Sequence, residues 1–140
     1  MPENNCACGV APTLIFSCSG SADVGEISDR AARKMTREGL GKMYCLAGVG
    51  SHINSFLMNA GAAGKILVID GCQVDCARKL IEHAGFMDIE HIRVTDMGME
   101  KGKSPASEER IDAVLQSGKM ILGMNTSSKS INLKAEGIER

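Results

Sequence analysis

Four consecutive aliphatic residues, in the segment KILVID at residues 65–70, constrain the fold more than any other feature of the sequence. A strand with one face in water alternates apolar and polar side chains, whereas a parallel strand covered on both faces is apolar throughout. Gly71 follows the segment directly and marks its end. The segment therefore predicts a buried strand in a parallel sheet, whose crossover connections are usually helices.

The rest of the chain alternates between short apolar runs and segments in which apolar residues recur at helical spacing. Further strands are expected at residues 13–18, 42–47 and 90–95, and helices at 27–37, 53–60, 74–84 and 108–116. Right-handed crossovers place such helices on both faces of a sheet. The sequence therefore predicts an α/β fold, a three-layer sandwich of flavodoxin- or Rossmann-like form with a mainly parallel sheet of four to five strands.

A chain of 140 residues is long enough for one domain. Residues 13–118 are expected to form it, with Gly118 ending the last helix. Residues 1–12 show no periodicity and are expected to be a flexible leader. Residues 119–140 are expected to be a C-terminal extension, with a short fifth strand at 119–124 and a loose tail after it.

The composition narrows the range of partners. Sixteen Lys and Arg residues against seventeen Asp and Glu give a net charge of −1, and aromatic residues make up 3% of the chain. Nucleic-acid binders carry a basic excess or aromatic stacking platforms, so we expect no nucleic-acid partner. The sequence contains no apolar run of the ~18 residues that a membrane span needs and no signal-peptide pattern, so we expect no membrane partner and a cytoplasmic location.

The cysteines are the most informative residues, because a reducing compartment favours metal or redox roles over structural disulfides. Cys18, Cys45 and Cys72 are spaced 27 residues apart, which corresponds to one strand–helix unit each time. The carboxyl ends of parallel strands lie at one edge of the sheet, so these three thiols are expected to converge there. Cys76, four residues after Cys72, is expected to face the same side of the following helix.

Four converging thiols predict a metal site made of Cys18, Cys45, Cys72 and Cys76. Zinc is the first expectation, since Zn²⁺ takes four thiolates tetrahedrally at about 2.3 Å, although thiolates also hold Fe–S clusters. Simple packing of cysteines in the core is one alternative. Another is a thiol enzyme for redox or sulfur transfer, with Cys72 or Cys76 as an activated thiolate at a helix N-terminus. A third is a small-molecule sensor that uses the loops at this edge.

Other polar residues near the same edge have two interpretations each. Asp70 ends the apolar strand and can orient a ligand or cap the following helix. His52 is the one histidine expected near the edge, either as a partner of the site or as an exposed helix residue, while His83 and His91 are expected at the surface. A role for the Cys6 and Cys8 pair in the leader stays open.

Several segments together carry a resemblance to a known family. They are residues 16–34 (FSCSGSADVGEISDRAARK), 41–50 (GKMYCLAGVG), 69–79 (IDGCQVDCARK) and 97–103 (MGMEKGK), within the span 13–117. In these segments the chain resembles the DGC domain family, which takes its name from the tripeptide found here at residues 70–72. The resemblance implies zinc binding, inferred in the family from its cysteines, by Cys18, Cys45, Cys72 and Cys76, and it implies no established reaction.

Overall fold

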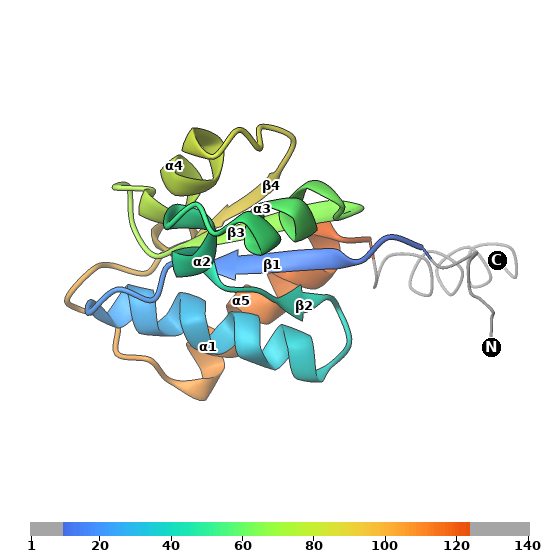
Figure 1. Ribbon diagram of the computed structural model, residues 1–140. Helices are drawn as coiled ribbons and strands as arrows, with labels where there is room; N and C mark the ends of the chain where they lie inside the picture. The colour runs from blue at the N-terminus through green and yellow to red at the C-terminus, as the bar shows by residue number, and fades with distance from the viewer. Residues whose placement is uncertain (1–9, 124–140) are drawn as a thin grey trace, which may run out of the picture.

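A parallel sheet with helices on both faces forms the centre of the protein, as the computed structural model of residues 10–123 shows (Figure 1). The four strands are β1 (Thr13–Ser17), β2 (Lys42–Met43), β3 (Lys65–Asp70) and β4 (Glu90–Arg93). The α-helices are α1 (Asp23–Arg37), α2 (Leu46–Gly50), α3 (Asn54–Gly61), α4 (Cys76–His83) and α5 (Glu108–Ile121), and a 3₁₀ turn, η1 (Val94–Met97), follows β4. The expected α/β fold is confirmed.

The strands run in the order β2-β1-β3-β4, and all neighbours pair in parallel. The chain passes from β1 to β2 on one side and then returns across β1 to β3 on the other. Strands β1 and β3 are therefore adjacent, and the strand order reverses between them. In open α/β sheets the crevice at such a reversal, outside the carboxyl ends of the strands, is the usual place for a ligand.

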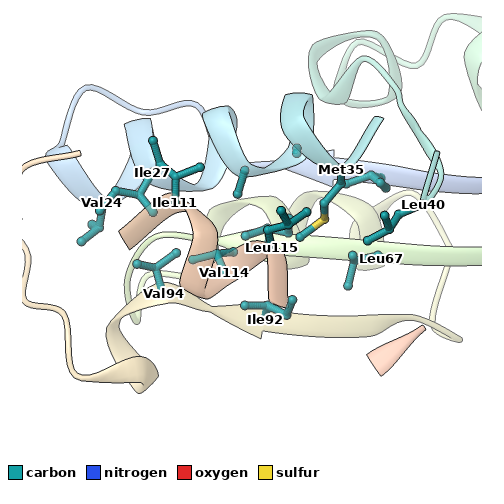
Figure 2. Close-up of a cluster of buried hydrophobic side chains, with 14 of the residues drawn as sticks. Val24, Ile27, Met35, Leu40, Leu67, Ile92, Val94, Ile111, Val114 and Leu115 are labelled. Carbon is teal, nitrogen blue, oxygen red and sulfur yellow. The ribbon is translucent and has the colours of Figure 1, made fainter. Parts of the chain in front are cut away.

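Two separate apolar layers bury the sheet. Helices α1 and α5 cover one face, where Ile27, Met35, Leu67 and Leu115 are among the buried side chains (Figure 2). Helices α2, α3 and α4 cover the other face. Because β1 and β3 lie between the two layers, their side chains are buried on both sides, which explains the non-alternating aliphatic run of β3.

Two expected elements differ from the structure. The second strand, expected at residues 42–47, is shorter than expected: β2 ends at Met43, and residues 46 and 47 belong to α2. The expected fifth strand at residues 119–124 is wrong over its described part, because α5 continues through Ile121. Gly118 does not end this helix; an added Cβ there would collide with the Met35 side chain, so the glycine allows close packing of α5 on α1.

Parts of the expected domain organisation lie outside the described residues. The leader is described only from Val10, so Cys6 and Cys8 are outside the described structure, as is the tail after residue 123. Between residues 10 and 123 no helix has both the length and the apolar character needed to cross a bilayer.

Candidate functional site

The reversal of strand order brings two of the predicted cysteines into contact. Cys18 directly follows β1 and Cys76 is the first residue of α4, and their Sγ atoms lie 3.3 Å apart. Cys18 is held on both sides of its peptide: its backbone N–H donates to the Ile69 carbonyl oxygen at 2.8 Å, and its own carbonyl oxygen accepts from the buried Ser28 hydroxyl. The thiol pair is therefore attached to the sheet and to α1 through fixed backbone.

Asp70, the last residue of β3, lies beneath the pair. Its carboxylate is fully buried, and a ligand oxygen of Asp70 and the two sulfurs all lie within 4.8 Å of one another. The carboxylate accepts the backbone N–H groups of Ala77 at 2.8 Å and Arg78 at 3.0 Å. Asp70 thus caps α4 from the neighbouring strand, because unpaired N–H groups at a helix start need an acceptor. The capping interpretation is confirmed, and the cap positions Cys76.

A second group of possible metal ligands, Asp70, Asp75 and His91, adjoins the site on the side away from the sulfurs. His91 Nε2 lies 2.9 Å from Asp70 and 3.8 Å from Asp75, so Asp70, Asp75 and His91 also form a group close enough for a metal ion. Both Asp75 oxygens, however, accept from the Arg93 guanidinium, at 2.8 and 2.5 Å. That interaction, by hydrogen bonding and charge, holds the pKa of Asp75 below its ordinary value. Both Asp75 oxygens are therefore already paired with a cationic side chain.

The contact of His91 with Asp70 was not expected from the sequence, which predicted that His91 lies at the surface. It is half-buried because β4 pairs with β3, with Val68 opposite His91. No motif or spacing indicates this contact, since only the strand order brings Asp70 and His91 together. His52, expected near the edge, is exposed, has a left-handed backbone (φ 57°) and packs edge-on against His83.

Two glycines allow the loops around the thiols to pack closely. A Cβ at Gly71 would meet the Val24 carbonyl carbon at 2.8 Å, and one at Gly25 would meet the Gly20 carbonyl oxygen at 2.7 Å. Such distances are well below normal van der Waals contact, so only glycine fits. The close approach of these loops leaves a hollow of about 250 Å³, whose lining includes three of the four predicted cysteines: Cys18, Cys72 and Cys76.

Cys72 and Cys45 lie outside the close group that Cys18, Asp70 and Cys76 form among the described residues. Cys72 lines the hollow but packs partly against the core on the α1 and α5 side. Cys45 is exposed at the start of α2, where its sulfur accepts the Gly48 backbone N–H at 3.3 Å, and it lines a different cleft. Among the described residues, neither belongs to a group of three ligands close enough for a metal ion. The structure therefore brings together two of the four, with a third nearby.

The electrostatics of the pair differ from the expectation of an activated thiolate. Partial burial of the Cys76 thiol, its hydrogen bond with Cys18, and the negative charges of Cys18 and Asp70 raise the pKa of Cys76 to about 11. These effects exceed the favourable effect of the α4 N-terminus. In the metal-free protein these effects oppose the activation that the helix N-terminus was expected to give Cys76, and they favour its neutral thiol at pH 7.

Comparison with known proteins identifies the family of the chain. The chain is 27% identical over 88 residues, 63% of its own length and 67% of the other protein, to the anaerobic and virulence modulator AnvM of Pseudomonas aeruginosa. No solved structure matches the chain. The sequence profile of the DGC domain matches residues 14–117, which contain the four cysteines discussed here and all four strands except the first residue of β1. The chain belongs to the DGC domain family.

Proposed function

We propose that the protein binds one zinc ion through Cys18, Cys45, Cys72 and Cys76 at the carboxyl edge of the sheet. The observation that carries the proposal is the 3.3 Å contact between the Cys18 and Cys76 sulfurs. Tetrahedral zinc–thiolate bonds of about 2.3 Å place neighbouring sulfurs about 3.8 Å apart. The distance between the Cys18 and Cys76 sulfurs therefore needs to increase by only about 0.5 Å, and small side-chain rotations supply this change.

The other two cysteines complete the ligand set by moving different distances. Cys72 already lines the hollow beside the pair and follows the turn at Gly71. Cys45 would give up the Gly48 N–H and turn from its cleft toward Cys18. Binding of the metal supplies the free energy for this change, since a deprotonated thiolate gains a metal bond in place of a weak hydrogen bond.

The donor chemistry favours zinc over harder metals. Thiolates are soft ligands that suit Zn²⁺, Cu(I) and iron–sulfur clusters, whereas Mg²⁺ and Ca²⁺ prefer oxygen. Asp70 supports the sulfurs indirectly: its oxygens are engaged by Ala77, Arg78 and His91, so it positions Cys76 rather than binding the metal itself. An iron–sulfur cluster on the same cysteines is the alternative metal group, and its colour distinguishes it from zinc.

A binding role is better supported than a thiol enzyme that uses Cys72 and Cys76. The Cys76 sulfur contacts Cys18, and its raised pKa makes it a weak nucleophile at pH 7. The relative AnvM is named as a modulator, a name that states no reaction. We place the protein in the cytoplasm, where a reducing environment keeps its cysteines free to bind metal.

Zinc affinity of single cysteine variants tests the proposal. Structural zinc sites bind with about 12 kcal/mol, or about 3 kcal/mol for each of four ligands, so Cys18→Ala or Cys76→Ala should weaken binding by at least about 100-fold. Competition with a chromophoric chelator measures the affinity, and Co²⁺ substitution counts the thiolates from the charge-transfer intensity. Cys6→Ala, outside the proposed ligand set, is the matched control.

The outcomes separate the ligand sets. Equal losses of zinc affinity in Cys18→Ala, Cys45→Ala, Cys72→Ala and Cys76→Ala support the four-cysteine site. Losses confined to Cys18→Ala, Cys72→Ala and Cys76→Ala would show a three-cysteine site with an open position. Zinc binding that survives Cys18→Ala and Cys76→Ala combined would refute the proposal.

A further inference from the structure

A second cleft lies beside the proposed metal site, between α1, α2 and α4. Its volume is about 580 Å³, more than twice that of the hollow at Cys18 and Cys76. Small-molecule sites in proteins typically occupy about 300–1,000 Å³ and combine apolar walls with a few polar groups. Neither the metal proposal nor the family membership gives this cleft a role.

The cleft has one apolar side and one polar side. The apolar side consists of half-buried side chains from β2, the segment after it, α2 and α4: Met43, Tyr44, Leu46 and Leu80. The Tyr44 hydroxyl bonds to Asn59, outside the cleft lining, so the ring contributes apolar surface. The second side comes from the end of β1 and from α1, and comprises Ser17, Ser19, Asp29 and Arg33.

The Arg33 guanidinium is held in place by Asp29, but only one of its three nitrogens takes part in that contact. Its Nε donates to Asp29 at 2.8 Å, and the Ser19 hydroxyl donates to the other Asp29 oxygen at 2.8 Å. Among the described residues, the two terminal nitrogens of Arg33 have no partner, and the side chain is 60% exposed. A guanidinium held by one edge in this way presents its remaining N–H groups to two oxygens of a planar anion.

The charge around the mouth favours an anion. Arg37, one turn along α1, has no acidic partner within the described part of the chain, and with Arg33 it borders an adjoining hollow of about 330 Å³. Asp29 carries one negative charge against the two arginines, which leaves a local charge of +1. On the floor, Ser17 is only 3% exposed and its hydroxyl has a single long contact, 3.4 Å from Ser19, so it has hydrogen-bonding capacity to spare.

We propose that this cleft binds a small organic anion, with a carboxylate head on Arg33 and an apolar body against Met43, Leu46 and Leu80. A monoanion matches the local charge of +1, and a planar carboxylate matches the free edge of the guanidinium. The apolar walls account for the body of the ligand, since burial of apolar surface drives its association. The cleft adjoins the proposed zinc site, because Cys45 is part of its lining, but Arg33, Met43, Leu46 and Leu80 are not proposed metal ligands, so anion binding does not depend on metal.

Octanoate, with 1-octanol as its uncharged counterpart, tests the assignment. Titration of the full chain, labelled with ¹³C at methionine and leucine methyl groups, should shift the Met43, Leu46 and Leu80 signals. A hydrogen-bonded charge pair contributes about ten- to hundredfold in affinity, so octanoate should bind at least about tenfold more tightly than octanol. Measurements on metal-free and zinc-treated protein keep the result independent of zinc binding.

A matched pair of variants separates the site from general charge effects. Arg33→Gln should reduce octanoate affinity to that of octanol. Arg30→Gln, on the same helix but paired with Glu26 and Glu108 and outside the cleft lining, should leave it unchanged. Equal binding of octanoate and octanol, equal effects of the two variants, or no methyl shifts at millimolar octanoate would each overturn the proposal.

Discussion

Replacing Gly71 with alanine should weaken both the fold and the site, because the β3–α4 turn rests against the first turn of α1. The new Cβ would lie 2.8 Å from the Val24 carbonyl carbon, 2.9 Å from its oxygen and 2.9 Å from the Gly25 nitrogen. All three atoms are backbone, so no side chain can rotate away. Ordinary carbon contacts lie at about 3.5 Å or more, so the two turns must separate by roughly 0.7 Å.

The cost follows from the size of that displacement. Overpacking of this kind destabilises proteins by about 1–3 kcal/mol, and the lower chain entropy of alanine in the unfolded state returns roughly 0.4–1 kcal/mol. We therefore expect Gly71→Ala to lower the free energy of unfolding by about 1–2 kcal/mol. For a domain of this size the corresponding fall in Tm is about 4–8 °C.

Thermal and urea denaturation of metal-free protein measure this change, with Gly61→Ala as the matched control. An added Cβ at Gly61 meets only Phe86 Cε1, at an ordinary 3.7 Å, and lies in α3. That variant should be neutral or more stable by up to about 1 kcal/mol. If Gly71→Ala and Gly61→Ala had the same stability, the close approach of the two turns would be refuted. Zinc affinity of Gly71→Ala should also fall, because Cys72 moves with the turn.

Three further predictions concern the thiol pair. Zinc affinity should rise about tenfold per pH unit near neutrality for each thiol that must lose a proton. The reason is that the pKa of Cys76 is raised to about 11, so the metal has to displace its proton. An affinity that stays constant from pH 6.5 to 7.5 in a chelator competition would contradict this prediction. In metal-free protein at pH 7, iodoacetamide followed by mass spectrometry should find Cys76 labelled more slowly than Cys45, because the pKa of Cys76 is raised although both residues are exposed. Faster labelling of Cys76 would support the thiol-enzyme interpretation. Asp70→Asn should lower zinc affinity by about 10–100-fold through loss of the cap that positions Cys76, whereas Asp96→Asn, at an exposed ion pair with Arg93, should bind zinc normally by the same assay.

Local sequence patterns predicted most of the helices and strands. They failed where the same residues suit two different local structures. The run at β3 was predicted with its observed bounds, because consecutive aliphatic residues with a glycine after them suit a strand covered on both faces. The five-residue α2 was missed, since LAGVG contains two glycines and is too short to show helical periodicity. Gly118 was taken as the end of a helix, but a glycine that allows close packing on Met35 looks the same in the sequence.

The sequence by itself determined the alternation of strands and helices, and the even spacing of Cys18, Cys45 and Cys72 predicted that thiols follow the strands at the carboxyl edge of the sheet. Only the tertiary structure decided which of them meet. The order β2-β1-β3-β4 sets Cys18 beside Cys76, while the early end of β2 leaves Cys45 at the head of α2. Periodicity is a local property read along the chain, whereas strand adjacency and the buried contact of Asp70 with His91 depend on pairing between distant segments. That pairing is selected by the packing of the whole core.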